Sequence, residues 1–501
     1  MMNILYIVTR IDGMKSIWNK YFRFVFLALL IYMPLFGHLD TLPIRVWDES
    51  RLAVNAVEMY YDGDWIVTHF DGKPDMWNTK PPLMIWAQVI CMKLLGPGEL
   101  AVRLPSALAG FLTCVLLLVF SLRYLRSYWF GFICIMVLIT THGYLNVHST
   151  RTGDYDALLA FFTTCGCIVF FFYCEEPSKQ RLYAFFGMLV LGVLTKGIAG
   201  MLLLPGVVVY GLLQKKLSYI WKSKHFYLGA LGVLAIISGY YLLREAYNPG
   251  FLNAVVENEL GGRYLEINEG HSAGFWYYFN NLLDFQMPEW SWMIPIGWAT
   301  GLASNDDRMR KVSQFSMSMA LTYFLVISAS QTKLEWYDVP IYPFLSMAVA
   351  QAMYFVYEWL RGSQWINAAL QVNVIPLIAV FYTFNQPFQR VWEQSYKPAV
   401  YAWEKDLYEI GFYLQHAAKG SVDMHDCYIL FPGYSAQNLF YAHILTHQGK
   451  NVSIRDPALL VKDDVVVVGE DEMKNYLSEH FEYEEISRRG VVIMYRIHGR
   501  K

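Results

Sequence analysis

Four charged residues just after the first apolar segment have the types and spacing that chemistry on a phosphate-linked substrate requires. Asp48, Glu49 and Arg51 lie within the run WDESR, and Lys80 ends the polar, aromatic-rich stretch that this run opens. A carboxylate can accept the proton of an attacking group or hold a divalent metal ion. Lys and Arg stabilise the negative charge that develops on a departing phosphate. The set indicates transfer of a group from a phosphate-linked donor.

Several residues that could take part in this chemistry also have a purely structural explanation. Asp48 or Ser50 is suited to cap the helix that follows, and so is Asp156 in a later polar segment. Lys196 is placed where a lysine can extend toward lipid headgroups. A single histidine such as His271 is more often a surface residue than a ligand, because a metal needs further partners. These alternatives remain open from sequence alone.

The composition is that of a membrane protein. Of 501 residues, 55% are hydrophobic and only 16% are charged, whereas soluble domains carry about a quarter charged residues. A net charge of -2 and the lack of a basic stripe give no reason to expect nucleic-acid binding. The 7 cysteines show neither a disulfide framework nor a zinc pattern.

The chain contains many apolar runs that are long enough to cross a hydrocarbon core, and the charged residues lie mostly between them. Glu99 and Arg103, near the start of the second run, are expected to pair with each other. We predict roughly eleven membrane-spanning helices, near residues 21–38, 103–122, 128–147, 156–174, 182–196, 198–214, 225–243, 291–304, 313–330, 338–358 and 365–384.

The short apolar run 82–96 decides the topology. Cytoplasmic loops carry an excess of Lys and Arg. If 82–96 lies along the membrane surface, every short basic loop falls on the same side as Lys15, Lys20 and Arg23; if it spans, the rule fails. We therefore predict a surface helix, a cytoplasmic N-terminus and an outer face that carries the candidate residues. A membrane enzyme facing away from the cytoplasm has no nucleotide pool, so its donor is expected to be lipid-linked.

The chain divides into two predicted regions. A transmembrane region, 1–384, includes a first outer loop at 39–102 and a large outer loop at 244–290. The remainder, 385–501, is predicted to be a soluble α/β domain on the outer surface. It is expected to hold a helix at 401–418, a strand at 427–431, a helix from Ala436 and buried strands at 465–468 and 491–495.

Six segments, taken in order, resemble the family that holds bacterial aminoarabinose transferases of lipid A and protein O-mannosyltransferases. The similarity covers roughly residues 20–385, and the six segments read WDESRLAVNAVEMYYDGDWIVTHFDGKPDMWNTKPPLMIW, ELAVRLPSAL, RTGDYDALLAFF, LTKGIAGMLLLP, HSAGFWYY and TKLEWYDVPIYPFL. The resemblance implies an α-helical GT-C fold with roughly eleven to thirteen transmembrane helices and helices lying along the outer face. It also implies that the tail is similar to the periplasmic α/β domain of the aminoarabinose branch.

The activity implied by this resemblance is an inverting glycosyl transfer in the bacterial inner membrane. The donor would be a polyprenyl phosphate sugar, and the acceptor, at the periplasmic face, would be lipid A, another glycolipid or glycan, or a protein. Matched by motif, the catalytic candidates are Asp48 and Asp156, and Glu49, which follows Asp48, is a further candidate. The expected phosphate-binding residues are Lys80, Arg51 and Lys196, and the expected substrate-lining residues are Lys333 and Tyr337.

The resemblance leaves open whether the chain binds a divalent metal ion. His271 precedes Phe275 and Trp276 as a metal-binding histidine does in the aminoarabinose enzymes. Those enzymes usually carry an acid before the phosphate-binding lysine, where this chain has Thr79, and a tyrosine where it has Leu52.

Two other classes of function compete with a transferase. A transporter or flippase for a polar lipid would carry ionisable residues in the middle of its helices, whereas the centres of these apolar runs are nearly free of charge. A scaffold whose outer α/β domain binds a partner would leave Asp48 and Lys80 without a role.

Overall fold

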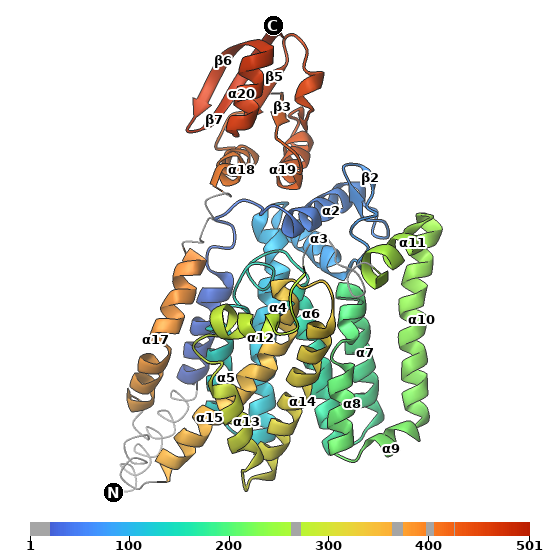
Figure 1. Ribbon diagram of the computed structural model, residues 1–501, viewed down its shortest axis with the longest axis vertical. Helices are drawn as coiled ribbons and strands as arrows, with labels where there is room; N and C mark the ends of the chain where they lie inside the picture. The colour runs from blue at the N-terminus through green and yellow to red at the C-terminus, as the bar shows by residue number, and fades with distance from the viewer. Residues whose placement is uncertain (1–20, 262–271, 363–373, 397–404, 425) are drawn as a thin grey trace, which may run out of the picture.

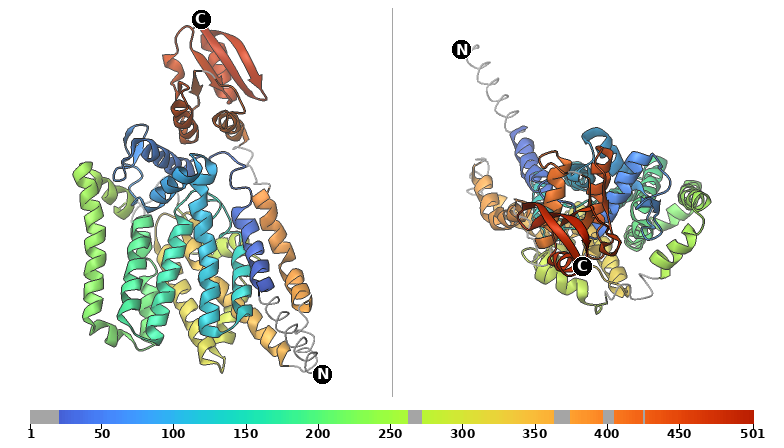
Figure 2. Two further views of the ribbon diagram at one scale, coloured as in Figure 1. Left: turned by 180° about the vertical axis from the view of Figure 1, so that it is seen from behind. Right: turned by 90° about the horizontal axis from the view of Figure 1, so that it is seen from above.

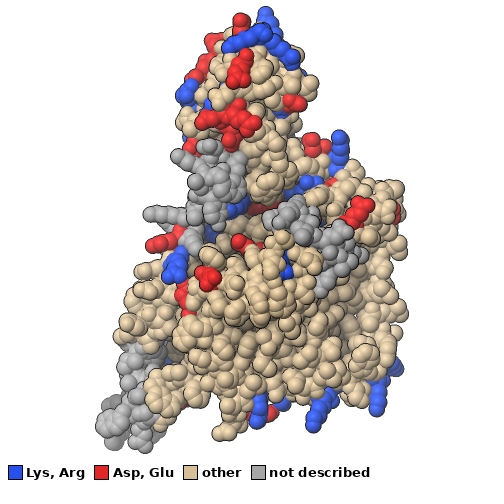
Figure 3. All heavy atoms as spheres, viewed as in Figure 1, with Lys and Arg blue, Asp and Glu red and all other residues tan. Residues whose placement is uncertain are grey.

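Long apolar helices stand side by side and carry a smaller α/β region at one end (Figure 1). The computed structural model describes residues 21–261, 272–362, 374–396, 405–424 and 426–501. Within these ranges 6 helices are long and apolar enough to cross a membrane. On the face drawn in Figure 3, charged side chains gather toward the two ends of the bundle and leave a broad uncharged band between them. This distribution is expected of a bundle surrounded by lipid.

The helices of the bundle follow the apolar runs of the sequence. The six longest candidates comprise α4 (Glu99–Phe120), α6 (Asp156–Glu175), α7 (Lys179–Lys196), α10 (Lys224–Tyr247), α14 (Asp307–Ala329) and α15 (Tyr342–Arg361). Shorter apolar helices are Tyr21–Phe36, α5 (Tyr128–Ile139), α8 (Leu204–Leu213) and α13 (Met293–Leu302), and α17 is Val374–Tyr396. The predicted run 365–384 falls partly outside the described residues, and the predicted boundary at 384/385 lies within α17.

Short helical turns connect these helices. They are η1 (Ser121–Leu125), η2 (Gly197–Met201), α9 (Leu217–Trp221), α11 (Phe251–Val255), η3 (Val256–Gly261), α12 (Tyr277–Asn281), η4 (Leu282–Gln286) and η5 (Glu335–Ile341). Close packing between the long helices depends on small residues in places. At Gly297 of α13 an added Cβ would lie 1.7 Å from the Ala348 carbonyl oxygen of α15, so only glycine allows this approach.

The first outer loop folds into two helices at the end of the bundle that carries the α/β region. They are α2 (Asp48–Asp62), which lies across that end in Figure 1, and α3 (Leu83–Leu95), with the strands β1 (His69–Phe70) and β2 (Lys73–Pro74) between them. Gly63, in the left-handed conformation at φ 76°, ends α2. The 13 residues of α3 extend about 20 Å, less than the hydrocarbon core of about 30 Å. Because α5, α8 and α13 are shorter still, length alone does not separate α3 from the helices of the bundle, and the surface placement of 82–96 stays a prediction.

The C-terminal region contains a 5-stranded sheet in the order β4-β3-β5-β7-β6. The first three strands in this order are parallel, whereas β7 is antiparallel to both β5 and β6. The elements are α18 (Lys405–Ala418), β3 (Cys427–Leu430), α19 (Ala436–His447), β4 (Val452–Ile454), η7 (Pro457–Leu459), β5 (Val465–Val468), α20 (Asp471–His480), β6 (Phe481–Arg489) and β7 (Val492–Arg500). The predicted strands at 427–431, 465–468 and 491–495 correspond to β3, β5 and β7.

The C-terminal region packs directly on α2 (Figure 2). Val54 and Val57 of α2 share an apolar core with Phe440 and Leu445 of α19. At the edge of this core the hydroxyl of Tyr441 donates to Glu99 at 2.6 Å and accepts the backbone N–H of Ile44 at 3.0 Å. The element that carries Asp48 is therefore held between the bundle and the α/β region.

The expected pair between Glu99 and Arg103 is not the one that forms. Arg103 instead forms an ion pair with Glu49 at 2.7 Å. Glu99 accepts the hydrogen bond from Tyr441 and forms an ion pair with Lys419 at 3.4 Å. The sequence could not show this, because the true partners lie 54 and more than 300 residues away along the chain.

Replacing Tyr441 by phenylalanine is expected to lower the free energy of unfolding by about 1.5–3 kcal/mol, because a buried carboxylate loses a hydrogen-bond donor. Thermal unfolding of the purified protein in detergent measures the effect. Tyr476→Phe makes the same change on α20, away from this contact, and is the control. Equal melting temperatures for the two variants would contradict the assignment.

Candidate active site

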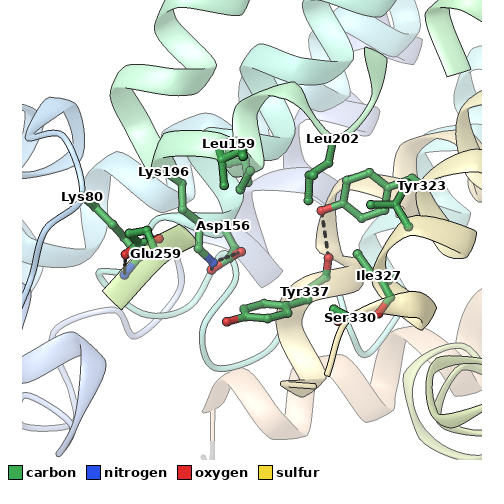
Figure 4. A pocket seen from close by; sticks show the side chains of 13 residues that line it. Lys80, Asp156, Leu159, Lys196, Leu202, Glu259, Tyr323, Ile327, Ser330 and Tyr337 are labelled. Carbon is green, nitrogen blue, oxygen red and sulfur yellow. Dashed lines mark hydrogen bonds and ion pairs between the residues drawn. The ribbon is translucent and has the colours of Figure 1, made fainter. Parts of the chain in front are cut away.

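A cavity of about 410 Å³ lies among α6, α7, η2, α14 and η5 (Figure 4). One part of its wall is apolar and is formed by Leu159, Ile198, Ala199, Leu202, Val326 and Ile327. The polar side chains on its wall are Lys80, Asp156, Lys196, Glu259, Tyr323, Ser330 and Tyr337. A cavity with these two kinds of wall suits a ligand that has both an apolar chain and an anionic group.

Asp156 and Lys196 meet because two neighbouring antiparallel helices end together. Asp156 is the first residue of α6, and Lys196 is the last residue of α7. The Lys196 Nζ donates to both carboxylate oxygens of Asp156, at 2.6 and 2.7 Å. Each charge also complements its helix terminus. Asp156 is therefore not the helix cap, a position held by Tyr155, and Lys196 is buried instead of reaching toward lipid headgroups.

Lys80 enters the cavity from the first outer loop and faces Glu259. Its Nζ lies 3.2 Å from the Glu259 carboxylate, which also accepts from the Thr79 hydroxyl at 3.3 Å. The Nζ also lies 5.7 Å from the centre of the Tyr155 ring. The Glu259 carboxylate thus occupies the position beside Lys80 that the anionic group of a bound ligand would take. Glu259 was missed by sequence reasoning, because nothing in the predicted loop 244–290 distinguishes it from its neighbours.

Tyr337 completes this wall. Its ring lies 5.3 Å from the Lys196 Nζ, and its carbonyl oxygen accepts a hydrogen bond from the Tyr323 hydroxyl at 3.0 Å. The predicted substrate-lining position of Tyr337 is therefore on the cavity, as Figure 4 shows.

A second cavity of about 40 Å³ adds Asp48 and Arg51 to the same site, because it shares Lys80, Asp156 and Lys196 with the first. Asp48 is the first residue of α2 and its side chain is 57% exposed. The cap position is Trp47, so the helix-cap explanation of Asp48 does not apply. Five charged residues singled out from the sequence are thus brought together from four distant segments.

Arg51 acts mainly on the loop that carries Lys80. Its guanidinium binds Asp75 through two hydrogen bonds, at 2.9 and 2.6 Å. Burial alone would raise the pKa of Asp75, but Arg51 and the backbone N–H of Asn78 lower it overall. Asp75 stays ionised and accepts the N–H groups of Trp77 and Asn78. Arg51 thereby fixes the turn just before Lys80.

The contacts of Glu49 indicate a structural role. It is buried, receives both arms of Arg103, and accepts the backbone N–H groups of Arg45 and Gly153 at 2.8 and 2.9 Å. Burial alone would raise the pKa of Glu49, but Arg103 lowers it overall. Among the described residues that line the two cavities Glu49 is absent. It ties the first outer loop to the loop before α6.

Lys333 also lies beside the site instead of lining it. Its Nζ donates to the Ser328 carbonyl at 3.0 Å and to the Ser330 carbonyl, at the C-terminal end of α14. Burial lowers the pKa of Lys333. The remaining predicted residue, His271, is outside the described residues.

The exposed carboxylate of Asp48 forms a group of three potential metal ligands with His148 and Asp154. The Nδ1 of His148 lies 3.7 Å from Asp48 Oδ2 and 3.5 Å from Asp154 Oδ2. His148 was not singled out from the sequence, because it follows an apolar run with no acidic neighbour within five positions. Thr79 supplies no carboxylate, so the ligand pair implied by the resemblance does not fit this chain.

The chain is similar to known proteins at three levels. A family model described as dolichyl-phosphate-mannose-protein mannosyltransferase matches residues 79–241. The undecaprenyl phosphate-alpha-4-amino-4-deoxy-L-arabinose arabinosyl transferase of Edwardsiella ictaluri is 29% identical over 376 residues, covering 72% of this chain and 63% of that protein. The protein of the same name from Aeromonas salmonicida is 26% identical over 377 residues, covering 71% and 64%. The alignments therefore span just under two thirds of these relatives.

Two solved structures share the fold. ArnT from Cupriavidus metallidurans, bound to undecaprenyl phosphate, superposes with a TM-score of 0.66 at 18% identity, covering 94% of this chain and 97% of that one. The Archaeoglobus fulgidus oligosaccharyltransferase superposes with a TM-score of 0.53 at 11% identity, covering 94% and 74%. At such low identity the likeness concerns the fold.

Proposed function

We propose that this chain, as a member of the GT-C family of aminoarabinose and protein mannosyl transferases, is a membrane glycosyltransferase that uses a polyprenyl phosphate sugar as donor. The observation that carries the proposal is the cavity whose apolar wall adjoins Lys80, Lys196 and Asp156. The names of the relatives, and the undecaprenyl phosphate bound to the ArnT structure, support the class of donor.

The donor phosphate would replace the carboxylates that now contact the two lysines. Its isoprenoid chain would lie against the apolar wall, and its phosphate would lie between Lys80 and Lys196. The bond between the anomeric carbon and the phosphate oxygen breaks, and the polyprenyl phosphate leaves with the electron pair. The two ammonium groups stabilise the second negative charge that this step creates on the phosphate.

The acceptor would enter from the side of Asp48. Its oxygen attacks the anomeric carbon on the face opposite the leaving phosphate, which inverts the configuration. If the acceptor is a hydroxyl, its proton passes to the exposed carboxylate of Asp48. If the acceptor is a phosphate, which is already ionised at neutral pH, no base is required, and Asp48 orients the donor or holds a metal ion.

The proposed location is a bacterial inner membrane with the site at the periplasmic face. The end of the bundle opposite the site carries the basic short loops, such as 121–127 and 214–224. The positive-inside rule then puts the N-terminus in the cytoplasm and the α/β region, proposed as a soluble domain, in the periplasm. Lipid A, another glycolipid or glycan, or a protein is the proposed acceptor.

Transfer of label from a radioactive polyprenyl phosphate sugar tests this function. Purified protein in proteoliposomes, supplied with a membrane extract as acceptor, is expected to move label into a glycolipid, glycan or protein fraction. Asp48→Asn is expected to lose this transfer, whereas Asp62→Asn, an exposed change on the same helix, is expected to keep it.

The same assay separates a transferase from a transporter. Label that stays on the polyprenyl carrier, with the carrier crossing the bilayer equally well in both variants and wild type, would contradict the proposal and support a flippase.

A further inference from the structure

We propose that Asp48, His148 and Asp154 bind one divalent metal ion at the wall of the candidate active site. The three side chains come from α2 and from the loop before α6, and one ligand atom of each lies within 4.8 Å of the others. Ligands that share one ion at about 2.1 Å lie about 3–4 Å apart, depending on geometry. The spacings of 3.5 and 3.7 Å around the His148 Nδ1 fall in this range.

The histidine is held with its Nδ1 toward the two acids. Its ring stacks on Trp336, with centroids 3.6 Å apart and an angle of 18° between the planes. The Nδ1 is buried and makes no hydrogen bond of good geometry within the described residues; its nearest polar neighbours are the carboxylate oxygens of Asp154 and Asp48, at 3.5 and 3.7 Å. A buried ring nitrogen without a hydrogen bond is costly. Coordination to an ion would satisfy it.

The acids around His148 favour a cation. Asp154 is buried, and its Oδ2 accepts the Thr152 hydroxyl at 2.5 Å, which fixes the carboxylate. Asp156 is neutralised by Lys196, but Asp48 and Asp154 have no such lysine or arginine within 4 Å among the described residues. One imidazole nitrogen and two carboxylate oxygens suit an ion of the Mn²⁺ or Zn²⁺ class.

The exposed side chain of Asp48 leaves room for the ion to take further ligands. Asp48 and Asp154 also line the second cavity, together with Lys80 and Lys196. An ion here would add positive charge beside the donor phosphate. This role rests on the proposed function, whereas binding of the ion does not.

Titration with Mn²⁺ followed by electron paramagnetic resonance tests the site, because bound Mn²⁺ loses the signal of the free aqueous ion. The purified full chain in detergent, without donor or acceptor, is expected to bind one Mn²⁺ that His148→Ala and Asp154→Asn each weaken at least about 10-fold. Asp48→Asn, which changes an exposed side chain and needs no repacking, is expected to weaken it as well. His225→Ala, at the start of α10, is the control and is expected to bind like wild type.

Unchanged Mn²⁺ binding in Asp48→Asn and His148→Ala, or failure of wild type to bind Mn²⁺, would overturn the metal site. If wild type without bound metal still transfers sugar, the proposed function stands and only the role of the ion in the transfer is contradicted. Mn²⁺ binding that depends on the three residues, without any sugar transfer, would support the site and contradict the proposed function.

Discussion

The Lys80→Ala variant is expected to fold normally and to transfer sugar about 100- to 1,000-fold more slowly than wild type. Lys80 is the lysine that the first outer loop brings to the cavity, and its partner Glu259 lies where the donor phosphate would bind. Its loss removes a positive charge from the leaving group at the moment when negative charge develops there. The single-turnover rate at saturating labelled donor measures the effect.

Two further variants show whether the charge itself matters. Lys80→Arg keeps the positive charge and is expected to recover part of the rate. Lys73→Ala, an exposed change on β2 of the same loop, is expected to transfer sugar as wild type does. A Lys80→Ala rate equal to that of wild type would remove Lys80 from the reaction.

The Glu49→Gln variant is expected to lose about 3–5 kcal/mol of stability, because it leaves the buried Arg103 without its counter-charge. Thermal unfolding in detergent, or unfolding by denaturant, measures the loss. Glu479→Gln makes the same change at an exposed position on α20 and is the control. If Glu49→Gln is no less stable than the control, the pair does not hold the first outer loop in place.

The effect of Glu49→Gln depends on pH in a defined direction. Because the folded protein lowers the pKa of Glu49 below its ordinary value of 4.5, the ionised carboxylate stabilises the fold fully above that pH. The contribution is lost as the pH falls from 4.5 through the lowered pKa. Wild type and Glu49→Gln are therefore expected to converge in stability in acid.

Much of the helical fold could be predicted, because apolar length and charge placement are local properties of the sequence. The runs 156–174 and 225–243 correspond to α6 and α10 within a few residues. The family resemblance is confirmed by the family model, the relatives and the shared fold. The strand β6 was not predicted, because eight of its nine residues are exposed and its sequence lacks a period-2 apolar pattern.

The site could be predicted only as a set of residues, not as a set of contacts. Motif matching brought forward Asp48, Lys80, Asp156 and Lys196, and the structure gathers them around adjoining cavities. Motif matching could not show which of two adjacent acids faces the cavity. A helix turns by about 100° per residue, and in α2 that rotation sends Asp48 outward and Glu49 inward.

A structure of the protein with polyprenyl phosphate bound tests the central claim most directly. The phosphate is expected about 3 Å from the Nζ atoms of both Lys80 and Lys196, with Glu259 displaced from Lys80 and the isoprenoid chain along Leu159 and Leu202. A phosphate bound elsewhere, with the contact between Lys80 and Glu259 intact, would contradict the account.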